Sequence, residues 1–236
     1  MNQGDRDVIQ VSDLSHTFPV GNNTGFTVLN NINFEIEQGK IAAIMGKSGS
    51  GKSTLLNLLS GYLKPRTGRI VLNDKDVTGF NENEWAKFRL NNLGFVFQSY
   101  QLISSMTVFE NVQMPLMVKG ISPGRRTELV FEMLEKVGLY SHTEFYPDQL
   151  SGGQQQRTSV ARALINNPEI LLADEPTGSL DSYNEKLLLE LIYQLNDELG
   201  ITVLLVTHDK EVAEKSHEII RVKDGHIIEQ DDDRDF

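Results

Sequence analysis

Residues 46–54 read GKSGSGKST, and this short stretch constrains the fold more than any other feature of the chain. Four of its residues have the spacing of a Walker A phosphate-binding loop: Gly46, Gly51, Lys52 and Ser53. The glycines let the backbone wrap closely around phosphates, where a Cβ would clash or φ must be positive. The apolar run IAAIM at 41–45 precedes the loop and a helical pattern at 53–63 follows it. This strand–loop–helix order predicts an α/β fold.

The Walker A loop carries the groups that phosphate chemistry needs. Lys52 supplies positive charge to the β- and γ-phosphates of a nucleotide, and the Ser53 hydroxyl can ligate Mg²⁺. A glycine-rich turn that merely caps a helix is the alternative, but the flanking strand and helix favour nucleotide binding. We therefore expect the whole loop to contact nucleotide: Gly46, Lys47, Ser48, Gly49, Ser50, Gly51, Lys52, Ser53 and Thr54.

A second phosphate-binding device is the sequence LSGGQ at 150–154, at the start of a helix predicted over 154–164. Backbone N–H groups at the start of a helix lack partners within the helix, and the helix dipole is positive there, so this end suits an anion. A chain with two separate phosphate-binding ends predicts a nucleotide that is clamped between two surfaces.

Two adjacent carboxylates, Asp174 and Glu175, follow the apolar run ILLA at the end of a predicted strand. Adjacent strand residues point to opposite faces, so we expect different roles for them. Asp174 can hold the hydration shell of Mg²⁺, and Glu175 can polarise the attacking water as a general base. An acidic strand-to-loop transition on the surface is the alternative, and the Walker A loop makes it the weaker one.

His208 and Gln98 also follow apolar strands. If strands 41–45, 170–174 and 202–206 are neighbours, their carboxyl ends meet in one crevice, where open α/β sheets bind ligands. His208 would then donate a hydrogen bond to the γ-phosphate, and the Gln98 side-chain oxygen can ligate Mg²⁺ or the water. For Gln98 alone, a plain polar residue at the end of an edge strand is the default interpretation. The other histidines are interpreted as ordinary surface residues: His16, His142, His217 and His226.

Composition excludes several classes of protein. The 236 residues carry a net charge of −11, which argues against nucleic acid as a partner, because backbone phosphates require clustered Lys and Arg. The chain has no cysteine, which excludes disulfides and thiolate zinc sites. From the polar start of the chain we expect no signal peptide, and the longest apolar runs are far shorter than the ~20 residues of a membrane span. We expect a soluble protein that reaches a membrane only through a partner.

The remaining pattern predicts the order of the elements. Residues 7–11 and 26–36 alternate like strands of an antiparallel sheet, and runs that are apolar on both faces predict central parallel strands at 170–174 and 202–208. From about 82 to 165 the pattern is mainly helical, with breaks expected at Pro115, Pro123 and Pro147. The other expected elements are a strand pair at 69–77 that turns at Asn73-Asp74, a helix at 183–199, a hairpin that turns at Asp224-Gly225, and an acidic tail at 231–236.

Taken in order, these motifs resemble the nucleotide-binding subunits of ABC transporters over nearly the whole chain. The matching stretches are Walker A (46–54), a Q-loop glutamine (Gln98), the signature LSGGQQQR (150–157), Walker B ILLADE (170–175), the D-loop SLD (179–181) and the switch histidine (His208). The resemblance implies an α/β P-loop NTPase of ABC type with an antiparallel β subdomain and an inserted helical subdomain. It implies one ATPase domain over 7–236, with core and β subdomain at about 7–97 and 166–230 and the helical subdomain at about 98–165.

The resemblance also implies ATP and Mg²⁺ as cofactors and a head-to-tail homodimer or heterodimer. Each ATP would lie between the Walker A loop of one subunit and the signature side of the other, contributed by Ser151, Gly152, Gly153, Gln154 and Asp181. It assigns catalysis to Lys52, Gln98, Glu175 and His208, and metal binding to Ser53, Gln98 and Asp174.

One position departs from the family pattern. The family usually stacks adenine on a tyrosine shortly before the first loop, and the matching residue here is Phe18. A phenyl ring still offers a π-face, so adenine binding should survive without the hydroxyl. The alternative is a core phenylalanine at a strand end.

Longer stretches at 31–61, 94–116 and 146–182 look like the branch of MacB-type macrolide exporters and LolD-type lipoprotein-release ATPases. That branch implies an ATP-hydrolysing subunit that powers a membrane transporter through ATP-driven dimerisation at the cytoplasmic face of the membrane. A permease helix would dock near 99–120, whose apolar residues look exposed, although they could equally pack the helical subdomain's own core. A mechanotransmission or signalling ATPase that moves no substrate is the alternative function.

Overall fold

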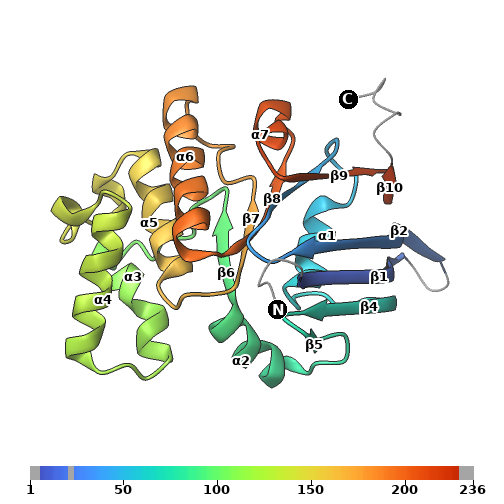
Figure 1. Cartoon of the computed structure of the whole chain (residues 1–236), viewed down its shortest axis with the longest axis horizontal. Coiled ribbons are helices and arrows are strands. Elements are labelled where there is room, and N and C mark those ends of the chain that lie inside the picture. Colours follow the sequence, from blue (N-terminus) through green and yellow to red (C-terminus); the bar gives the residue numbers. More distant parts are fainter. Residues whose placement is uncertain (1–5, 21–23, 229–236) are drawn as a thin grey trace.

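The computed structural model describes residues 6–20 and 24–228, which form two β-sheets surrounded by helices (Figure 1). The larger sheet has the strand order β10-β9-β3-β8-β7-β6. Its strands are β3 (Ile41–Met45), β6 (Leu93–Phe97), β7 (Ile170–Asp174), β8 (Thr202–Thr207), β9 (Glu218–Lys223) and β10 (His226–Ile228). All neighbours pair in parallel except the β9–β10 hairpin, which turns at Asp224-Gly225 as expected.

The central strands are buried on both faces, which explains their continuous apolar runs. Along β8, Leu204 and Val206 pack into one core, whereas Val203 and Leu205 pack into the other. The first core lies against helix α1 (Lys52–Leu59), and the second against α5 (Gly152–Leu164) and α6 (Ser182–Leu199). Helices therefore cover both faces of the six-stranded sheet, as in other α/β folds.

The smaller sheet is antiparallel, with the order β2-β1-β4-β5. Its strands are β1 (Asp7–Val20), β2 (Thr24–Glu37), β4 (Thr67–Leu72) and β5 (Lys75–Asp76). The expected antiparallel pairing is confirmed, and both long strands extend beyond the predicted ranges. The β4–β5 turn also has the expected residues, since Asn73 and Asp74 both have positive φ.

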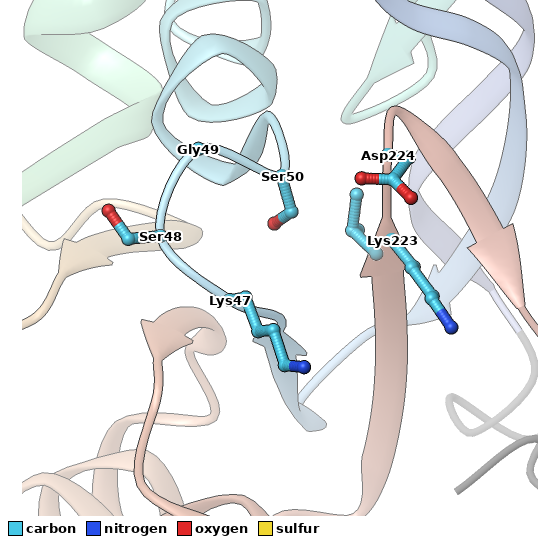
Figure 2. A pocket seen from close by; sticks show the side chains of 7 residues that line it. Lys47, Ser48, Gly49, Ser50, Lys223 and Asp224 are labelled. Carbon is cyan, nitrogen blue, oxygen red and sulfur yellow. The ribbon is translucent and has the colours of Figure 1, made fainter. Parts of the chain in front are cut away.

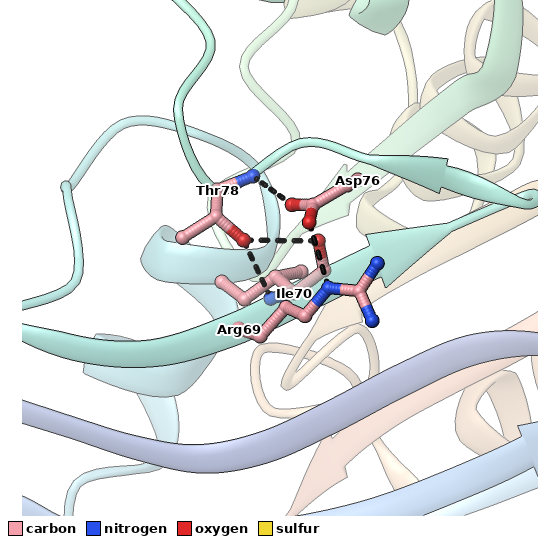
Figure 3. A network of polar contacts seen from close by, with 4 residues as sticks. All are labelled: Arg69, Ile70, Asp76 and Thr78. Carbon is pink, nitrogen blue, oxygen red and sulfur yellow. Dashed lines mark hydrogen bonds and ion pairs between the residues drawn. The ribbon is translucent and has the colours of Figure 1, made fainter.

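A polar network holds the β4–β5 hairpin (Figure 3). Arg69 Nε donates to Asp76 Oδ2 at 2.7 Å, and the Thr78 amide donates to the other carboxylate oxygen at 3.1 Å. The Thr78 hydroxyl in turn accepts from the Ile70 amide at 2.9 Å. The hydrogen bonds from Arg69 and Thr78 lower the pKa of Asp76 below its usual value.

Helix α1 ends at Leu59, four residues before the predicted end. Gly61 follows with a φ of 73°, and a Cβ at this position would lie 2.0 Å from the Trp85 ring. Trp85 belongs to α2 (Glu82–Asn92), which the chain forms before it enters β6. The helix thus stops where close packing against an aromatic ring requires glycine.

All the elements assigned between residues 98 and 165 are helices, and they pack around the second core. They are α3 (Val108–Val118), α4 (Pro123–Lys136), the 3₁₀ turns η1 (Tyr140–His142) and η2 (Pro147–Gln149), and α5. Pro123 and Pro147 begin elements, but the break expected at Pro115 was wrong because α3 continues through it. Val112 and Leu116 on either side are buried in the core, which outweighs the hydrogen bond that proline removes.

Helix α6 connects β7 to β8 and begins at an Asp181 cap. It covers the predicted range 183–199, and Gly200 ends it with a φ of 64°. A short helix, α7 (Lys210–Glu214), follows β8. The predicted tail at 231–236 lies outside the described residues.

Candidate active site

The carboxyl ends of β3, β8 and β7 meet in one crevice, as the sequence predicted. Strand β8 pairs with both neighbours, and the final residues Met45 and Thr207 are partners, as are Asp174 and Val206. The Glu175 amide donates to the Val206 carbonyl at 3.0 Å, which fixes the Walker B end against β8. The Walker A loop leaves β3 at this same edge of the sheet.

The Walker A lysine is folded back onto its own loop. Lys52 Nζ donates to the carbonyls of Gly46 at 2.7 Å and Lys47 at 2.9 Å. Burial lowers the pKa of Lys52, and the nearby charges of Glu175 and Asp174 oppose that shift. The ammonium is thus held at the loop, where nucleotide phosphates can exchange with the two carbonyls as partners.

The two Walker B carboxylates have different surroundings, but strand alternation is not the reason, because β7 ends at Asp174 and Glu175 lies beyond it. Burial and the charge of Glu175 raise the pKa of Asp174, whereas Lys52 and a hydrogen bond from Ser53 lower it. Glu175 has a φ of 45°, and its Oε1 lies 3.3 Å from His208 Nδ1. Asp174 therefore faces the Walker A serine, and Glu175 faces the switch histidine.

Two cavities adjoin these groups. One, of ≈ 320 Å³, is lined by Phe26, Val28, Ser48, Gly49, Gly51, Lys52, Ser53, Thr54 and Glu175. The other, of ≈ 180 Å³, is lined by Glu175 together with Thr177, Gly178, Leu180, Glu185, Thr207, His208 and Asp209. Glu175 is common to both, so it stands between the phosphate loop and the switch histidine.

The aromatic residue in the first cavity is Phe26, not the Phe18 that the sequence indicated. The two residues are partners across the β1–β2 ladder. The Phe18 ring packs edge-on against His16 with centroids 4.7 Å apart, whereas the Phe26 side chain is 64% exposed. Sequence reasoning missed Phe26 because the register of the hairpin decides which ring reaches the loop.

A third cavity lies on the other side of the Walker A loop, and Lys47 lines this one and not the cavity that contains Lys52. This space, of ≈ 250 Å³, lies between the Walker A loop and the β9–β10 hairpin (Figure 2). Lys47 and Ser50 line it from the loop, with Lys223 and Asp224 on the opposite side. The hairpin is bonded to the loop, because the Gly225 amide donates to the Ser50 carbonyl at 3.2 Å.

The Q-loop and D-loop residues contact each other. The Ser179 hydroxyl donates to the Gln98 carbonyl at 3.2 Å, and the Gln98 amide leaves no room for a Cβ on Gly178. The Asp181 carboxylate caps its own helix by accepting from the amides of Tyr183 and Asn184. These hydrogen bonds, chiefly those from Asn184, lower the pKa of Asp181.

The signature loop starts α5 with a reciprocal cap. The Ser151 hydroxyl accepts from the Gln154 amide at 3.3 Å, and Gln154 Oε1 accepts from the Ser151 amide at 2.8 Å. A Cβ on Gly153 would lie 2.5 Å from Asn184 Oδ1, so glycine is needed for α6 to approach. None of the signature residues lines the Walker A cavities described above.

Helix α5 links the signature loop to the crevice through two side chains that sequence reasoning missed. Buried Gln156 donates to the carbonyls of Phe97 at 3.1 Å and Pro176 at 2.7 Å. Arg162 donates to the carbonyls of Tyr100 at 3.1 Å and Gln101 at 2.6 Å, two residues with positive φ. The signal for Gln156 was its place on the apolar face of the helix, four residues before Val160.

The interpretation of four histidines as surface residues holds for two of them. His217 and His226 are exposed, although His217 Nδ1 accepts from the Ile41 amide at 2.9 Å. His142 is half-buried, and its Nε2 lies 3.0 Å from the side-chain amide of Gln154. The interpretation was wrong for His16, which is buried at 8% exposure.

Comparison with known proteins identifies the family. A family model described as "ABC transporter" matches residues 29–178. The chain belongs to the ABC transporter family. It is 56% identical to the ABC transporter ATP-binding protein YtrE of Bacillus subtilis (strain 168), over 92% of this chain and 96% of that protein. It is 45% identical to the macrolide export ATP-binding/permease protein MacB of Vibrio parahaemolyticus serotype O3:K6, over 94% of this chain but only 34% of that longer protein.

Solved structures of ABC cassettes have the same fold. The dimeric post-hydrolysis state of the ATP-binding cassette MJ0796, bound to ADP and Pi, matches with a TM-score of 0.85 and 39% identity, covering 94% of this chain and 97% of that one. The structure of cbiO1 from Clostridium perfringens also matches with a TM-score of 0.85, at 30% identity, over 94% and 87% of the two chains. The chain is therefore an ABC-type ATPase that binds ATP, and cassettes of this family form dimers and work with membrane permeases.

In the described part of the chain, no helix has the length and apolar character needed to cross a bilayer.

Proposed function

We propose that this chain is the ATP-hydrolysing subunit of a membrane export complex and drives it by ATP-dependent dimerisation at the cytoplasmic face of the membrane. The observation that carries the proposal is the separation of two phosphate-binding ends. The Walker A loop, both carboxylates and His208 share one crevice, whereas Ser151 opens α5 elsewhere and lines neither Walker A cavity. A second subunit would supply the missing signature.

Binding would begin at the Walker A loop. The phosphates would replace the Gly46 and Lys47 carbonyls as partners of Lys52, whose buried ammonium is already at the loop. The base would stack on the aromatic residues of the β1–β2 hairpin, with Phe26 beside the cavity and Phe18 as its cross-strand partner. The start of α5 from the second subunit would add backbone N–H groups to the γ-phosphate.

The residues at the crevice fit Mg²⁺. Ser53 and Asp174 are hydrogen-bonded to each other, and their oxygen atoms are the hard donors that Mg²⁺ prefers. Mg²⁺ would neutralise charge on the phosphates when bound. Gln98, the other predicted ligand, packs against Gly178 and Ser179. It would therefore connect the Mg²⁺ site to the D-loop.

Hydrolysis would depend on Glu175. Its carboxylate lines the phosphate cavity and lies 3.3 Å from His208 Nδ1, so the histidine would orient the carboxylate that accepts a proton from water. Closure of the second subunit would exclude bulk water and strengthen these electrostatic contacts. Turnover would therefore require the dimer.

The membrane partner would dock in a groove between α2, β6, α3 and α5. This cavity of ≈ 320 Å³ is lined by Tyr62, Arg89, Leu90, Leu93, Gly94, Phe95, Phe97, Met114, Pro115, Arg162, Ala163 and Asn166. It overlaps the predicted segment 99–120 only at Met114 and Pro115, and Val108 and Leu116 of that segment are buried in the core. Its apolar lining and Arg89 would suit a short amphipathic helix that carries an acidic residue.

Export as the direction of transport rests on the printed function of MacB, whose ATP-binding part is the portion similar to this chain. The decisive test is the dependence of specific ATPase activity on protein concentration. Activity per molecule should rise as the protein is concentrated into the range where ATP-bound dimers form. Full activity in dilute, strictly monomeric protein would contradict the proposal.

A further inference from the structure

His142 reaches the signature helix from the 3₁₀ turn η1. Its Nε2 lies 3.0 Å from Gln154 Nε2, and the imidazole packs edge-on against the Phe145 ring with centroids 5.1 Å apart. The histidine is half-buried, so the ring is held on one side by an aromatic residue and on another by the signature glutamine.

The direction of the hydrogen bonds follows from donor and acceptor chemistry. Gln154 Oε1 accepts from the Ser151 amide at 2.8 Å, so the amide nitrogen of this side chain is the atom that faces His142. An amide NH₂ group can only donate, so His142 Nε2 must be the acceptor. The imidazole proton is then on Nδ1, which donates to the Ser141 hydroxyl at 3.1 Å.

These bonds form one continuous chain from η1 to the tip of the signature loop. The Ser151 amide donates to Gln154, Gln154 donates to His142, and His142 donates to Ser141. If the Gln154 side chain rotated by half a turn, its NH₂ would face the Ser151 N–H, donor against donor. The Ser151 N–H thus sets the glutamine orientation, and the lone pair of His142 stabilises that orientation by accepting from the side-chain NH₂.

We propose that His142 is a positioning residue for the signature loop. By accepting from Gln154 it keeps the Ser151–Gln154 cap closed, and so keeps the Ser151 hydroxyl and the first turn of α5 in place for the nucleotide of the second subunit. The inference rests on the proposed function, in which this helix start completes the partner's site. His142 acts through Gln154 and is remote from the Walker A loop of its own chain.

The test compares two substitutions that distinguish the contribution of the aromatic ring from that of the hydrogen-bond acceptor. His142→Phe keeps an aromatic ring against Phe145 but has no lone pair for Gln154, whereas His142→Gln restores an acceptor at about the position of Nε2. Tyr140→Phe is the control, because it changes an exposed residue of the same turn that makes no bond to Gln154. All variants are made as full-length protein in both wild-type and Glu175→Gln backgrounds.

Three measurements are made: binding of a fluorescent ATP analogue to dilute protein, ATP-driven dimerisation by sedimentation in the Glu175→Gln background, and ATPase rate. His142→Phe should bind the analogue as wild type does but dimerise about tenfold more weakly, with a matching loss of rate, because each dimer loses two hydrogen bonds. His142→Gln and Tyr140→Phe should stay within about twofold of wild type. In a Gln154→Ala background, His142→Phe should have no further effect, because its only route is gone.

Unchanged dimerisation in His142→Phe overturns the inference, as does a His142→Gln protein that is equally impaired. Loss of analogue binding in His142→Phe also overturns it, because that residue would then support the fold generally. If the Glu175→Gln protein with no further substitution fails to dimerise with ATP, that result contradicts the proposed function instead.

Discussion

The Walker A crevice and the signature loop are both proposed to bind phosphate, yet they are built in opposite ways. The crevice collects Lys52, Asp174 and Glu175 at one edge of the parallel sheet and partly buries them, and this burial raises the pKa of Asp174 and lowers the pKa of Lys52. The signature loop is a single helix start whose own Ser151 and Gln154 close its cap, and Ser151 is exposed. Charged groups in the crevice are therefore held in surroundings that oppose their charge, whereas the signature loop satisfies its own cap and lines neither Walker A cavity.

In the proposed dimer, this difference gives the two regions different parts. The partly buried, oppositely charged groups of the crevice would bind the phosphates and Mg²⁺, and the exposed helix start of the second subunit would be brought to them by rigid-body docking.

The strongest prediction concerns the crevice alone. Glu175→Gln should lower turnover by ~10²–10⁴, because the general base is lost, while ATP-bound dimers persist. Single-turnover ATPase and sedimentation measure the two effects, and turnover within a few-fold of wild type would remove Glu175 from this role.

A second prediction separates the two regions by mixing chains. Lys52→Ala should lose nucleotide affinity, and Ser151→Ala should lower turnover by ~10² while its own Walker A loop still binds ATP. Because the defects lie in opposite halves, random pairing of the two variants leaves one intact site in half of the dimers. About a quarter of wild-type activity should return on mixing. If mixed samples stay as inactive as either variant, the two halves do not come from different chains.

A third prediction concerns the strain stored in the crevice. The raised pKa of Asp174 means that its ionised form destabilises the nucleotide-free protein, an effect that is absent at low pH and present once the pH rises above the folded-state pKa. Asp174→Asn should therefore raise the Tm of nucleotide-free protein at neutral pH by about 2–4 °C, while abolishing Mg²⁺-dependent hydrolysis. Calorimetry at pH 7 and at acid pH checks this, and a lower Tm at pH 7 would contradict it.

The smallest effect is expected far from both regions, in the β4–β5 hairpin. Asp76 has a lowered pKa, so its contribution to stability is present at neutral pH and is lost as the pH falls through the folded-state value. Asp76→Asn should cost only ~0.2–1 kcal/mol at pH 7, because the pair with Arg69 is exposed to solvent. Urea denaturation at pH 7 and pH 3 measures it, and the difference from wild type should shrink at the lower pH.

The crevice was predictable from the sequence because strands buried on both faces read as continuous apolar runs, and their polar ends must then meet at one edge. The antiparallel pairing of β1 with β2 and the turns at Asn73 and Asp224 were also predictable from local patterns, whereas the full strand order of the two sheets was not predicted. What was missed depends on distant packing. No local sequence pattern predicts that Phe26, rather than Phe18, lies beside the phosphate loop. The residues around His142 likewise do not predict its contact with Gln154.

The break expected at Pro115 was wrong for a related reason. A local rule about proline was applied where Val112 and Leu116 are held in the core by other helices. The subdomain boundaries at 97/98 and 165/166, and the roles of the individual site residues, remain proposals that the experiments above address.

The β9–β10 turn holds the phosphate loop in place, although the two are far apart in the sequence. The Gly225 amide is bonded to the Ser50 carbonyl of the phosphate loop, and the Gly225 carbonyl accepts from the Asn30 amide at 2.8 Å. Strand β3, from which the loop springs, is flanked by β8 and β9. On the ribosome, a nascent chain that already contains GKSGSGKST lacks the walls of its nucleotide pocket until β7, β8 and β9 have been synthesised. We therefore expect this loop to bind ATP only after the chain has been synthesised as far as Gly225.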